Sequence, residues 1–392
     1  MPKKASIDQA VVLAKAIHKA GAAGLSPIDL VGLAPSRSTL NRRLAELVRE
    51  GSIKELGAGR ATRYVSTSPL LKQDIELYFA RPWQERPYAP YREEWLQPLP
   101  GLDLDLAERC THIQAVVPKI DRRFFARFII DFSWGSSVLE GGTYTELDTQ
   151  ALVEYGQRNP DKPTEDALLV LNHKLAAEYL WGHLDLSMEQ ACAVHAFLTD
   201  NHGLLGVADS DHFLPNAQRG KAREFEEIHL GQSAYSPPFR PGTGYVAQAL
   251  GVILSTAKGL HPVQAAMYLM TRIPYLQAFA NGNKRTARLL ANAPLLQAGI
   301  MPLSFADMDK ADYIRAMSAF YELGDVTLIE QVFLRGYVKA IIRSSQIPPD
   351  VRVSGFDTNA VCQALLAYIR TGQIPLLKAA ALFIDKVTAR AR

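Results

Sequence analysis

Residues 277–288 read Gln-Ala-Phe-Ala-Asn-Gly-Asn-Lys-Arg-Thr-Ala-Arg, a glycine-centred turn that runs into a cationic helix start. The first N–H groups of a helix lack intrahelical partners and carry partial positive charge, which favours phosphate. Gly282 allows a tight turn and close approach of the backbone to a ligand. Arg285 and Arg288 are three residues apart, so they share one helix face, and Lys284 adds a third cation. The stretch predicts an anion-binding loop, although a helix start with solvated charges would share these features.

The sequence on both sides of the loop extends the pattern. The flanking segments are His261-Pro262, an alanine-rich run to Met270, 273–276, 289–292, 295–299 and a helix at Tyr313. With these segments at this spacing, residues 105–340 resemble the Fic/Doc family. The signature loop of that family is His-x-Phe-x-(Asp/Glu)-Gly-Asn-(Gly/Lys)-Arg-x-x-Arg. Upstream, His195 on an apolar helix and Gly203 match an earlier family helix, although a lone histidine is more often a core residue.

The resemblance implies an enzyme chemistry for this loop. In the family, the loop histidine takes a proton from a target hydroxyl, which attacks a nucleotide phosphate and usually places AMP on Ser, Thr or Tyr. The motif acid holds Mg²⁺, and the rest of the loop cradles the phosphates. Carried across, the residues implied to bind the nucleotide (ATP) are Phe279, Gly282, Asn283, Lys284, Arg285 and Arg288. Lysine rather than glycine at position 284 resembles the Doc branch, which transfers a phosphate by holding the nucleotide the other way round.

Two positions depart from the family pattern, and both remove proton or metal chemistry. Gln277 stands at the histidine position. An amide cannot act as a general base near neutral pH, and loss of such a base costs about 10²–10⁴-fold in rate. Asn281 stands at the acid position, and its neutral oxygen is a poorer ligand for Mg²⁺ than a carboxylate. We therefore expect ATP to bind while transfer to a protein hydroxyl is weak or lost.

Three interpretations of this loop stay open at the level of sequence. The first is a degenerate enzyme of adenylyltransferase type. The second is a non-enzymatic transcription regulator whose domain senses a nucleotide or a partner protein. The third is an active protein adenylyltransferase or kinase that uses another base, because positioning and electrostatics carry much of phosphoryl transfer.

A second motif lies at an upstream helix end. Residues 136–142 read Ser-Ser-Val-Leu-Glu-Gly-Gly. They resemble the family's inhibitory motif, (Ser/Thr)-x-x-x-Glu-(Gly/Asn), with Ser136, Glu140 and Gly141 at its positions. The resemblance implies that the glutamate pairs with Arg288 and competes with a phosphate for one guanidinium. The alternative is a glutamate at a helix end beside a glycine.

Residues 222–238 resemble the family's flap, a hairpin that pairs with an extended target segment by strand addition. Within them, residues 226–230 look like a short strand. The resemblance implies a protein partner at this flap, and an ordinary surface hairpin is the alternative.

The first 66 residues predict a small module of helices and a hairpin. The expected elements are helices near 11–17, 27–33 and 36–50, then hairpin strands at 53–56 and 61–65 around a glycine-rich tip. Pro27 suits a helix start, and Gly51 is a natural stop. This order resembles a winged helix-turn-helix.

The net charge of +3 is unevenly distributed. Residues 1–66 hold eleven Lys/Arg against five Asp/Glu, a charge of +6, so the other 326 residues sum to −3. A basic module on a near-neutral body indicates a polyanion partner, here DNA. The residues that would contact DNA are Ser38, Thr39, Asn41, Arg42, Arg43 and Arg60. Winged helices also bind proteins, and an operator of two half-sites would need a homodimer.

We therefore expect a mainly α protein with four parts. These are the module at 1–66, an ordered proline-rich connector at 67–103, a Fic-like all-α domain with a small flap at 104–345, and a tail at 350–392 with helices about 358–371 and 375–389. No apolar stretch is long enough for a membrane span, and the start lacks the apolar core of a secretion signal. Three widely spaced cysteines indicate neither a disulfide framework nor a metal cluster, so we expect a cytoplasmic protein.

Overall fold

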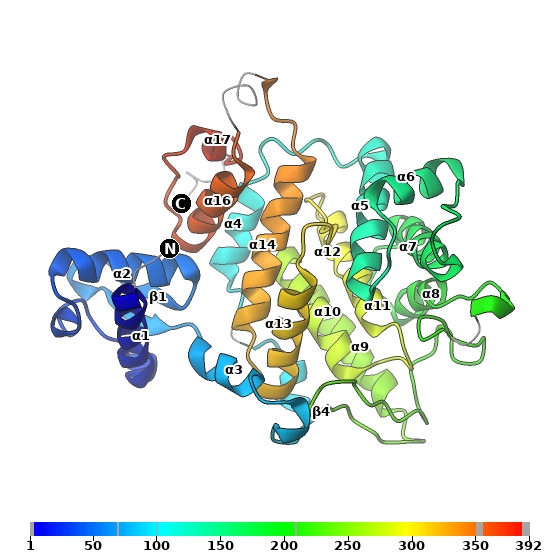
Figure 1. The fold of residues 1–392 in the computed structure, drawn as a ribbon, viewed down its shortest axis with the longest axis horizontal. Coiled ribbons are helices and arrows are strands. Elements are labelled where there is room, and N and C mark those ends of the chain that lie inside the picture. The colour runs from blue at the N-terminus through cyan, green and yellow to red at the C-terminus, as the bar shows by residue number, and fades with distance from the viewer. Residues whose placement is uncertain (1–3, 69, 100, 208–209, 350–355, 386–392) are drawn as a thin grey trace.

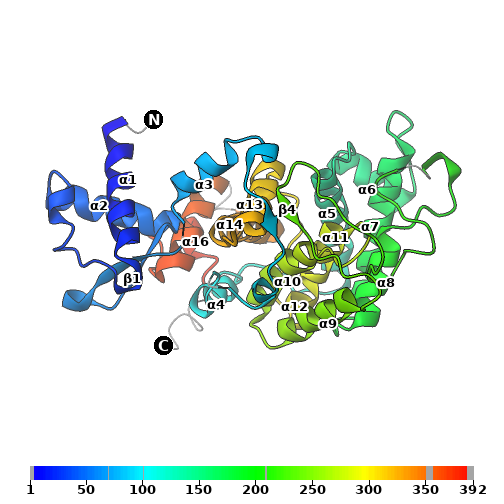
Figure 2. The ribbon, with the colours of Figure 1, turned by 90° about the horizontal axis from the view of Figure 1, so that it is seen from below.

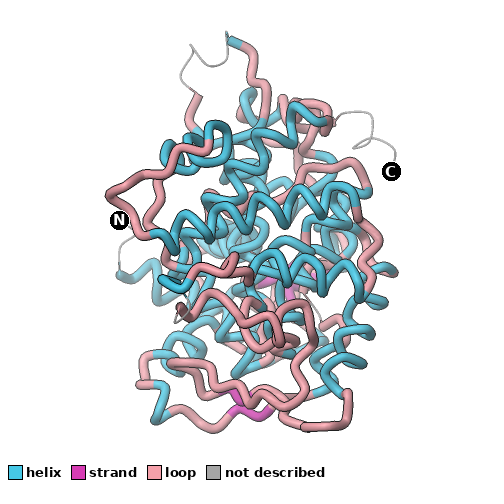
Figure 3. The backbone as a smooth tube through the Cα atoms, turned by 90° about the vertical axis from the view of Figure 1, so that its right-hand side faces the viewer, coloured by secondary structure: helices cyan, strands magenta, loops and turns pink. Residues whose placement is uncertain are grey.

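The computed structural model describes residues 4–68, 70–99, 101–207, 210–349 and 356–385. Helices dominate these residues and the strands are short, which confirms the expected mainly α fold (Figure 3). No helix in these ranges is both long and apolar enough to cross a bilayer. The helices are α1 (Lys4–Lys19), α2 (Arg37–Glu50), α3 (Lys72–Phe79), α4 (Leu104–His112), α5 (Arg122–Glu140), α6 (Glu146–Tyr155), α7 (Thr164–Gly182), α8 (Met188–Leu198), α9 (Tyr245–Lys258), α10 (Pro262–Leu276), α11 (Asn283–Leu290), α12 (Asn292–Gln297), α13 (Lys310–Leu323), α14 (Thr327–Ser344), α16 (Thr358–Thr371) and α17 (Lys378–Ala381). The strands are β1 (Ile53–Leu56), β2 (Arg63–Ser66), β3 (Ala89–Pro90) and β4 (Tyr235–Ser236).

The N-terminal module has a small core of its own, on the left of Figure 1. Leu13 of α1 and Leu40 and Leu44 of α2 are buried in it. β1 and β2 pair antiparallel behind these helices. Ser36 caps α2 by accepting a hydrogen bond from the Thr39 N–H at 3.1 Å. The module therefore holds the exposed face of α2 on a packed support.

The expected helix at 27–33 is wrong. Turns and a 3₁₀ helix at Val31–Leu33 stand in its place. Gly32 weakens helix formation, and Pro35 disfavours a helical conformation in the residue before it. The identification of the module as a winged helix-turn-helix stays a prediction.

The body is organised around α10, which runs through its centre against α9, α11 and α12 (Figure 1). Val263, Leu269 and most other residues of α10 are buried, as expected for a helix that is apolar all round. Pro262 opens the helix and His261 caps it. The motif loop follows α10 directly, so it starts from the most enclosed helix of the body.

The helix after the loop is interrupted. α11 ends at Leu290, and α12 begins at Asn292. Pro294 lacks an N–H, and its ring would clash with the carbonyl of Leu290 if one helix continued. α11 is therefore a short helix whose first turn belongs to the motif loop.

The segment 222–238 departs from the expected flap. The predicted strand at 226–230 is wrong, because these residues are irregular. The guanidinium of Arg223 donates to the carbonyls of Glu226 at 3.1 Å and of Pro238, which draws both ends of the segment around one side chain. β4 pairs in parallel with β3 of the connector, with Ala89 opposite Tyr235.

The connector lies against the body rather than in solvent. Glu322 of α13 accepts hydrogen bonds from Arg86 Nη1 at 2.9 Å and from the Tyr78 hydroxyl at 3.0 Å. The same carboxylate accepts from the Ser233 hydroxyl at 2.8 Å. One buried carboxylate thus joins the connector to the segment before β4.

The tail holds the expected first helix, and the expected second helix is shorter. α17 ends at Ala381, and the last part of the predicted range lies outside the described residues. The Phe383 carbonyl accepts from the Ala115 N–H at 3.0 Å, and the Asp385 N–H donates to His112 at 2.8 Å. These bonds to the end of α4 take the place of further helical bonds.

α16 lies between the module and the body, as Figure 2 shows. Arg370 of α16 pairs with Glu330 of α14 at 3.3 Å. Its guanidinium also lies against Gly51 at the C-terminus of α2, where a side chain would collide with it. The C-terminal tail therefore contributes the contact that joins the two parts.

Candidate functional site

The motif loop between α10 and α11 is fixed by its own side chains. Gln277 and Gly282 adopt left-handed backbone conformations with φ of 50° and 71°. The Asn283 amide closes the loop: its oxygen accepts from the Phe279 N–H at 2.9 Å and its nitrogen donates to the Phe279 carbonyl at 2.8 Å. A Cβ at position 282 would lie 2.7 Å from the Thr199 methyl carbon. Glycine is therefore required there by both conformation and space.

Gln277 serves the loop as a structural amide. Its nitrogen donates to the Pro274 carbonyl at 2.6 Å, and its oxygen accepts from the Asn283 amide at 2.9 Å. The side chain is buried, and both of its functional atoms are engaged. This position supplies no group that could take a proton from a target.

Phe279 and His195 form the floor of the loop. Their rings stack with centroids 3.9 Å apart and planes within 6°. The ring Nε2 of His195 donates to the Asn281 carbonyl at 3.0 Å, and Nδ1 accepts from the Gly220 N–H at 3.0 Å. Burial lowers the pKa of His195 to about 3, so the ring is neutral. His195 and Phe279 thus support the loop from the core.

The residues present do not fit a Mg²⁺ ion at the motif acid position. The Asn281 side-chain oxygen accepts from the Gly282 N–H, and its nitrogen donates to the Asp211 carbonyl. Mg²⁺ in nucleotide sites is held through carboxylates and phosphates. Within the described ranges, no three His, Cys, Asp or Glu side chains gather as metal ligands.

Glu140 and Arg288 form the central ion pair of the site. Arg288 Nη2 lies 2.6 Å from Glu140 Oε1, and the arginine side chain has no exposed surface. Burial alone would raise the pKa of Glu140, but Arg288 and Arg285 outweigh burial and lower it to about 2. The glutamate is therefore a carboxylate at any ordinary pH and occupies the guanidinium as a phosphate would.

A buried histidine, which the sequence did not reveal, completes this pair. His173 of α7 donates from Nδ1 to the Leu169 carbonyl at 2.6 Å. Its Nε2 accepts from the Ser136 hydroxyl at 2.8 Å, and that oxygen accepts from Arg288 Nε at 2.9 Å. Burial lowers the pKa of His173 to about 3, so the ring stays neutral. A chain of hydrogen bonds from the Leu169 carbonyl through His173 and Ser136 thus orients the Arg288 guanidinium toward Glu140.

Arg285 and Lys284 lie beside the ion pair. Arg285 donates to the carbonyls of Leu198 at 3.0 Å and His212 at 2.7 Å, so it also holds the segment after α8. Its Nε lies 3.9 Å from Glu140 Oε2. The Nε of Arg285 and the Nη1 of Arg288 are buried and have no hydrogen-bond partner in the described structure. Both guanidinium donors are therefore unsatisfied there.

Lys310 and Arg223 are further contributors that no motif marked. The ammonium of Lys310 lies over Gly141, 3.4 Å from the place of a Cβ there. The Arg223 guanidinium donates to the carbonyls of Leu276, at 3.3 Å, and Gln277, just before the loop. Both come from segments distant in sequence, and a single charged residue gives no periodic signal.

The residues predicted to bind DNA lie in the separate module. Ser38, Asn41 and Arg42 are exposed on α2, and Thr39 is partly buried. Arg49, which was not in the predicted set, is exposed on the same face. Arg43 instead pairs with Glu46 and is partly buried. The side chain of Arg60 lies outside the described structure. The fold therefore keeps this set apart from the motif loop.

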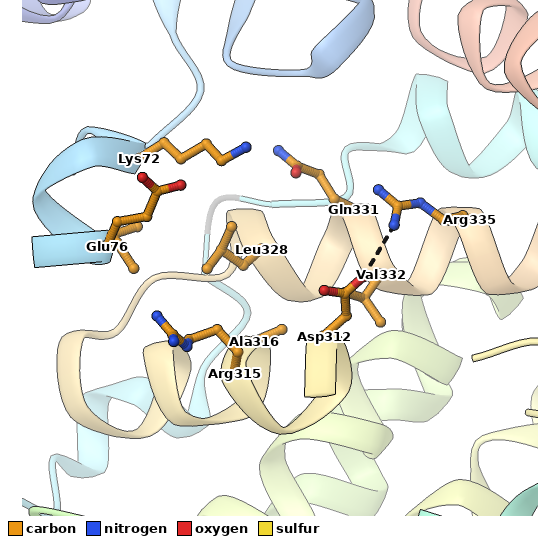
Figure 4. A pocket seen from close by; sticks show the side chains of 10 residues that line it. Lys72, Glu76, Asp312, Arg315, Ala316, Leu328, Gln331, Val332 and Arg335 are labelled. Atoms are coloured by element: carbon orange, nitrogen blue, oxygen red, sulfur yellow. Dashed lines mark hydrogen bonds and ion pairs between the residues drawn. The ribbon is translucent and has the colours of Figure 1, made fainter. Parts of the chain in front are cut away.

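A polar cavity of about 290 Å³ lies elsewhere, between α3, α13 and α14 (Figure 4). Arg335 and Asp312 form an ion pair at 3.2 Å on one side of it, and Lys72 and Glu76 of α3 lie on the other side. Its lining includes no residue of the motif loop. Its lining mixes the acidic side chains Glu76 and Asp312 with the basic side chains Lys72, Arg315 and Arg335.

Comparison with known proteins agrees with this geometry. Residues 185–295 match the Fic/DOC family. A protein from Nematostella vectensis named "Protein adenylyltransferase Fic" is 27% identical over 180 residues, which is 45% of this chain and 40% of that protein. "Protein adenylyltransferase fic-1" of Caenorhabditis briggsae is 23% identical over 247 residues, 62% of this chain and 44% of that protein. The chain thus spans less than half the length of these relatives.

A solved structure shows the same fold. A Fic family protein from Desulfovibrio desulfuricans G20 superposes with a TM-score of 0.50 at 17% identity, over 70% of this chain and 86% of that one. The matched family region contains α8 to α11 and the motif loop.

Proposed function

Because residues 185–295 form a Fic domain, we propose that this domain binds a nucleotide at residues 282–288 and that Glu140 competes with its phosphates. Transfer of AMP or phosphate to a protein hydroxyl is weak or lost. The relatives of this chain are named protein adenylyltransferases, which supports ATP as the nucleotide.

One observation carries the proposal: a buried arginine of the motif is paired with a carboxylate that comes from another helix. Arg288 has no exposed surface, yet its Nη1 and the Nε of Arg285 have no hydrogen-bond partner in the described structure. An arginine pair of this kind binds phosphate well, because a guanidinium presents several donors in a fixed plane. The carboxylate of Glu140 offers the same kind of acceptor and so acts as an internal competitor.

The lack of transfer follows from Gln277. Both atoms of its amide are engaged within the loop, and neither can accept a proton from a hydroxyl. Phosphates can still be cradled by the helix start and the arginines, since neither feature needs a base. The domain then works as a nucleotide sensor.

Calorimetry with ATP tests the proposal. Glu140→Gly removes the competitor, so we expect it to bind ATP roughly 5–150-fold more tightly than the unaltered protein. Adding Arg288→Met to that variant should abolish the gain. The matched control is Asp312→Gly, which removes the exposed carboxylate of the ion pair between Asp312 and Arg335. Absence of a heat of binding in Glu140→Gly would defeat the proposal.

A second activity is proposed for the N-terminal module, which we suggest binds DNA through the exposed face of α2. The exposed stripe of Ser38, Asn41, Arg42 and Arg49 supports it, because Arg and Asn can read base edges in a groove. In a gel shift at two salt concentrations, Arg42→Ala plus Arg49→Ala should weaken binding and its salt dependence. Arg240→Ala plus Arg335→Ala, two exposed arginines of the body, is the charge-matched control. Equal affinity for both double variants would remove α2 as the DNA contact.

A further inference from the structure

We propose that the motif loop binds its nucleotide without a divalent metal, and that the ammonium groups of Lys284 and Lys310 neutralise the phosphates in its place. This inference rests on the proposed function and specifies the form of the ligand, which is the free nucleotide and not its magnesium complex.

The first support is that the motif acid position is already occupied by other bonds. The oxygen of the Asn281 amide accepts from the Gly282 N–H, which folds the side chain back on its own backbone. The nitrogen donates to the Asp211 carbonyl. A metal at this position would share that oxygen with the Gly282 N–H and would gain a neutral ligand in place of a carboxylate. The Asn281 side chain therefore stabilises the loop through these two hydrogen bonds.

The second support is that two nearby glutamates are otherwise engaged and that the one aspartate at the loop contacts it through its backbone. Glu140 holds Arg288 at 2.6 Å. Glu165 accepts from the Ser210 hydroxyl and lies 3.6 Å from His212 Nε2. Asp211 presents its backbone carbonyl, not its carboxylate, to Asn281. A hard cation therefore finds no prepared set of oxygen ligands in this part of the described structure.

The third support is the number of basic groups around Glu140. Arg288 and Arg285 lie 2.6 and 3.9 Å from its oxygens. Burial lowers the pKa of Lys284. The charge of Glu140 raises this pKa, and the charges of Arg288 and Lys310 lower it further. Lys310, at the start of α13, places its ammonium over Gly141, the residue after Glu140. Three cations thus act on the charge of one carboxylate and Lys310 lies beside the next residue, and this surplus of positive charge suits an anion of high charge.

The surplus distinguishes two forms of the ligand. A free triphosphate carries more negative charge than its magnesium complex, so it gains more from four nearby cations in a poorly solvated site. Mg²⁺ placed among these cations would be repelled by them. When the phosphates displace Glu140, the released Arg288 joins the two lysines around them.

The experiment is calorimetry of ATP binding to full-length Glu140→Gly protein, once with EDTA and once with excess Mg²⁺. We expect affinity in EDTA to equal or exceed that in Mg²⁺. Lys284→Met plus Lys310→Met should lower the affinity in EDTA by at least about tenfold. Lys119→Met plus Lys258→Met, at two exposed lysines elsewhere, keeps the same net charge and should not change it.

A third variant should make ATP binding depend on Mg²⁺. Asn281→Asp added to the double lysine variant supplies a carboxylate, so its affinity for ATP should rise on addition of Mg²⁺. Binding by Glu140→Gly that needs Mg²⁺, or an unchanged affinity in the double lysine variant, would overturn the inference. Absence of binding with and without metal would instead contradict the proposed function.

Discussion

At the scale of single residues, Arg288 is a buried charge whose position depends on two partners. It is fully buried and depends on Glu140 for its counter-charge and on Ser136 for its orientation. Removing one partner of a buried ion pair leaves the other charge without compensation, which costs about 3–5 kcal/mol. The pair is therefore a requirement of the fold as well as a feature of the site.

We predict that Arg288→Met lowers the unfolding free energy of the domain by about 3 kcal/mol in urea denaturation. Glu140→Gln added to it should restore part of the loss, because the uncompensated carboxylate is then removed. Arg335→Met, at an exposed ion pair, should cost less than about 1 kcal/mol. If both single variants had the same small effect, the ion pair would be unimportant for stability.

We predict a pH dependence of stability from the neutral histidines of the site. Burial lowers the pKa of His173 to about 3, while an unfolded histidine titrates near 6.5. The unfolded chain therefore takes up protons first, so this stability is present above about pH 6.5 and is lost as the pH falls toward 3. In the His173→Gln variant, the midpoint temperature of thermal unfolding should change less between pH 7.5 and pH 5 than in the unaltered protein. The exposed His183→Gln serves as the control, and equal slopes in both variants would exclude His173 as the cause.

At the scale of elements, Arg223 controls the segment between α8 and α9. Its guanidinium joins the ends of 226–238 to the carbonyls before the motif loop. We predict that Arg223→Gln makes this segment a site of chymotrypsin cleavage near Phe225, detected by mass spectrometry. Arg240→Gln, an exposed arginine a few residues later, should leave the cleavage rate unchanged. Identical digestion of the two variants would contradict the role of Arg223.

Two elements show where prediction from the sequence succeeds and where it fails. The tail helix predicted at about 358–371 has these bounds in the structure, where Asp357 caps it and Gly372 ends it. The strand predicted at 226–230 was wrong, because the Arg223 guanidinium binds the carbonyls of Glu226 and Pro238 and holds the segment in an irregular conformation. The anion loop and Glu140 carry a local motif and could be predicted. Lys310 and His173 reach the site only through tertiary packing, for which a single sequence gives no signal.

At the scale of the whole molecule, the C-terminal helix α16 joins the module to the body. We predict that Arg370→Ala loosens this contact and increases the radius of gyration measured by small-angle X-ray scattering. The arginine lies against Gly51 and pairs with Glu330, so its loss removes both contacts at once. Arg335→Ala on the neighbouring α14 is the control. A radius equal to that of the unaltered protein would show that the module docks without Arg370.

We propose that the motif loop holds a nucleotide and that transfer of AMP or phosphate from it is weak or lost. The most direct measurement is to incubate Glu140→Gly protein with ATP labelled on the α- and γ-phosphates, in EDTA and in Mg²⁺, and to analyse the complex by mass spectrometry. The account predicts intact ATP recovered from the protein, with no mass added to the chain or to a protein target. Stoichiometric covalent AMP or phosphate on a hydroxyl, or the absence of bound nucleotide, would contradict it.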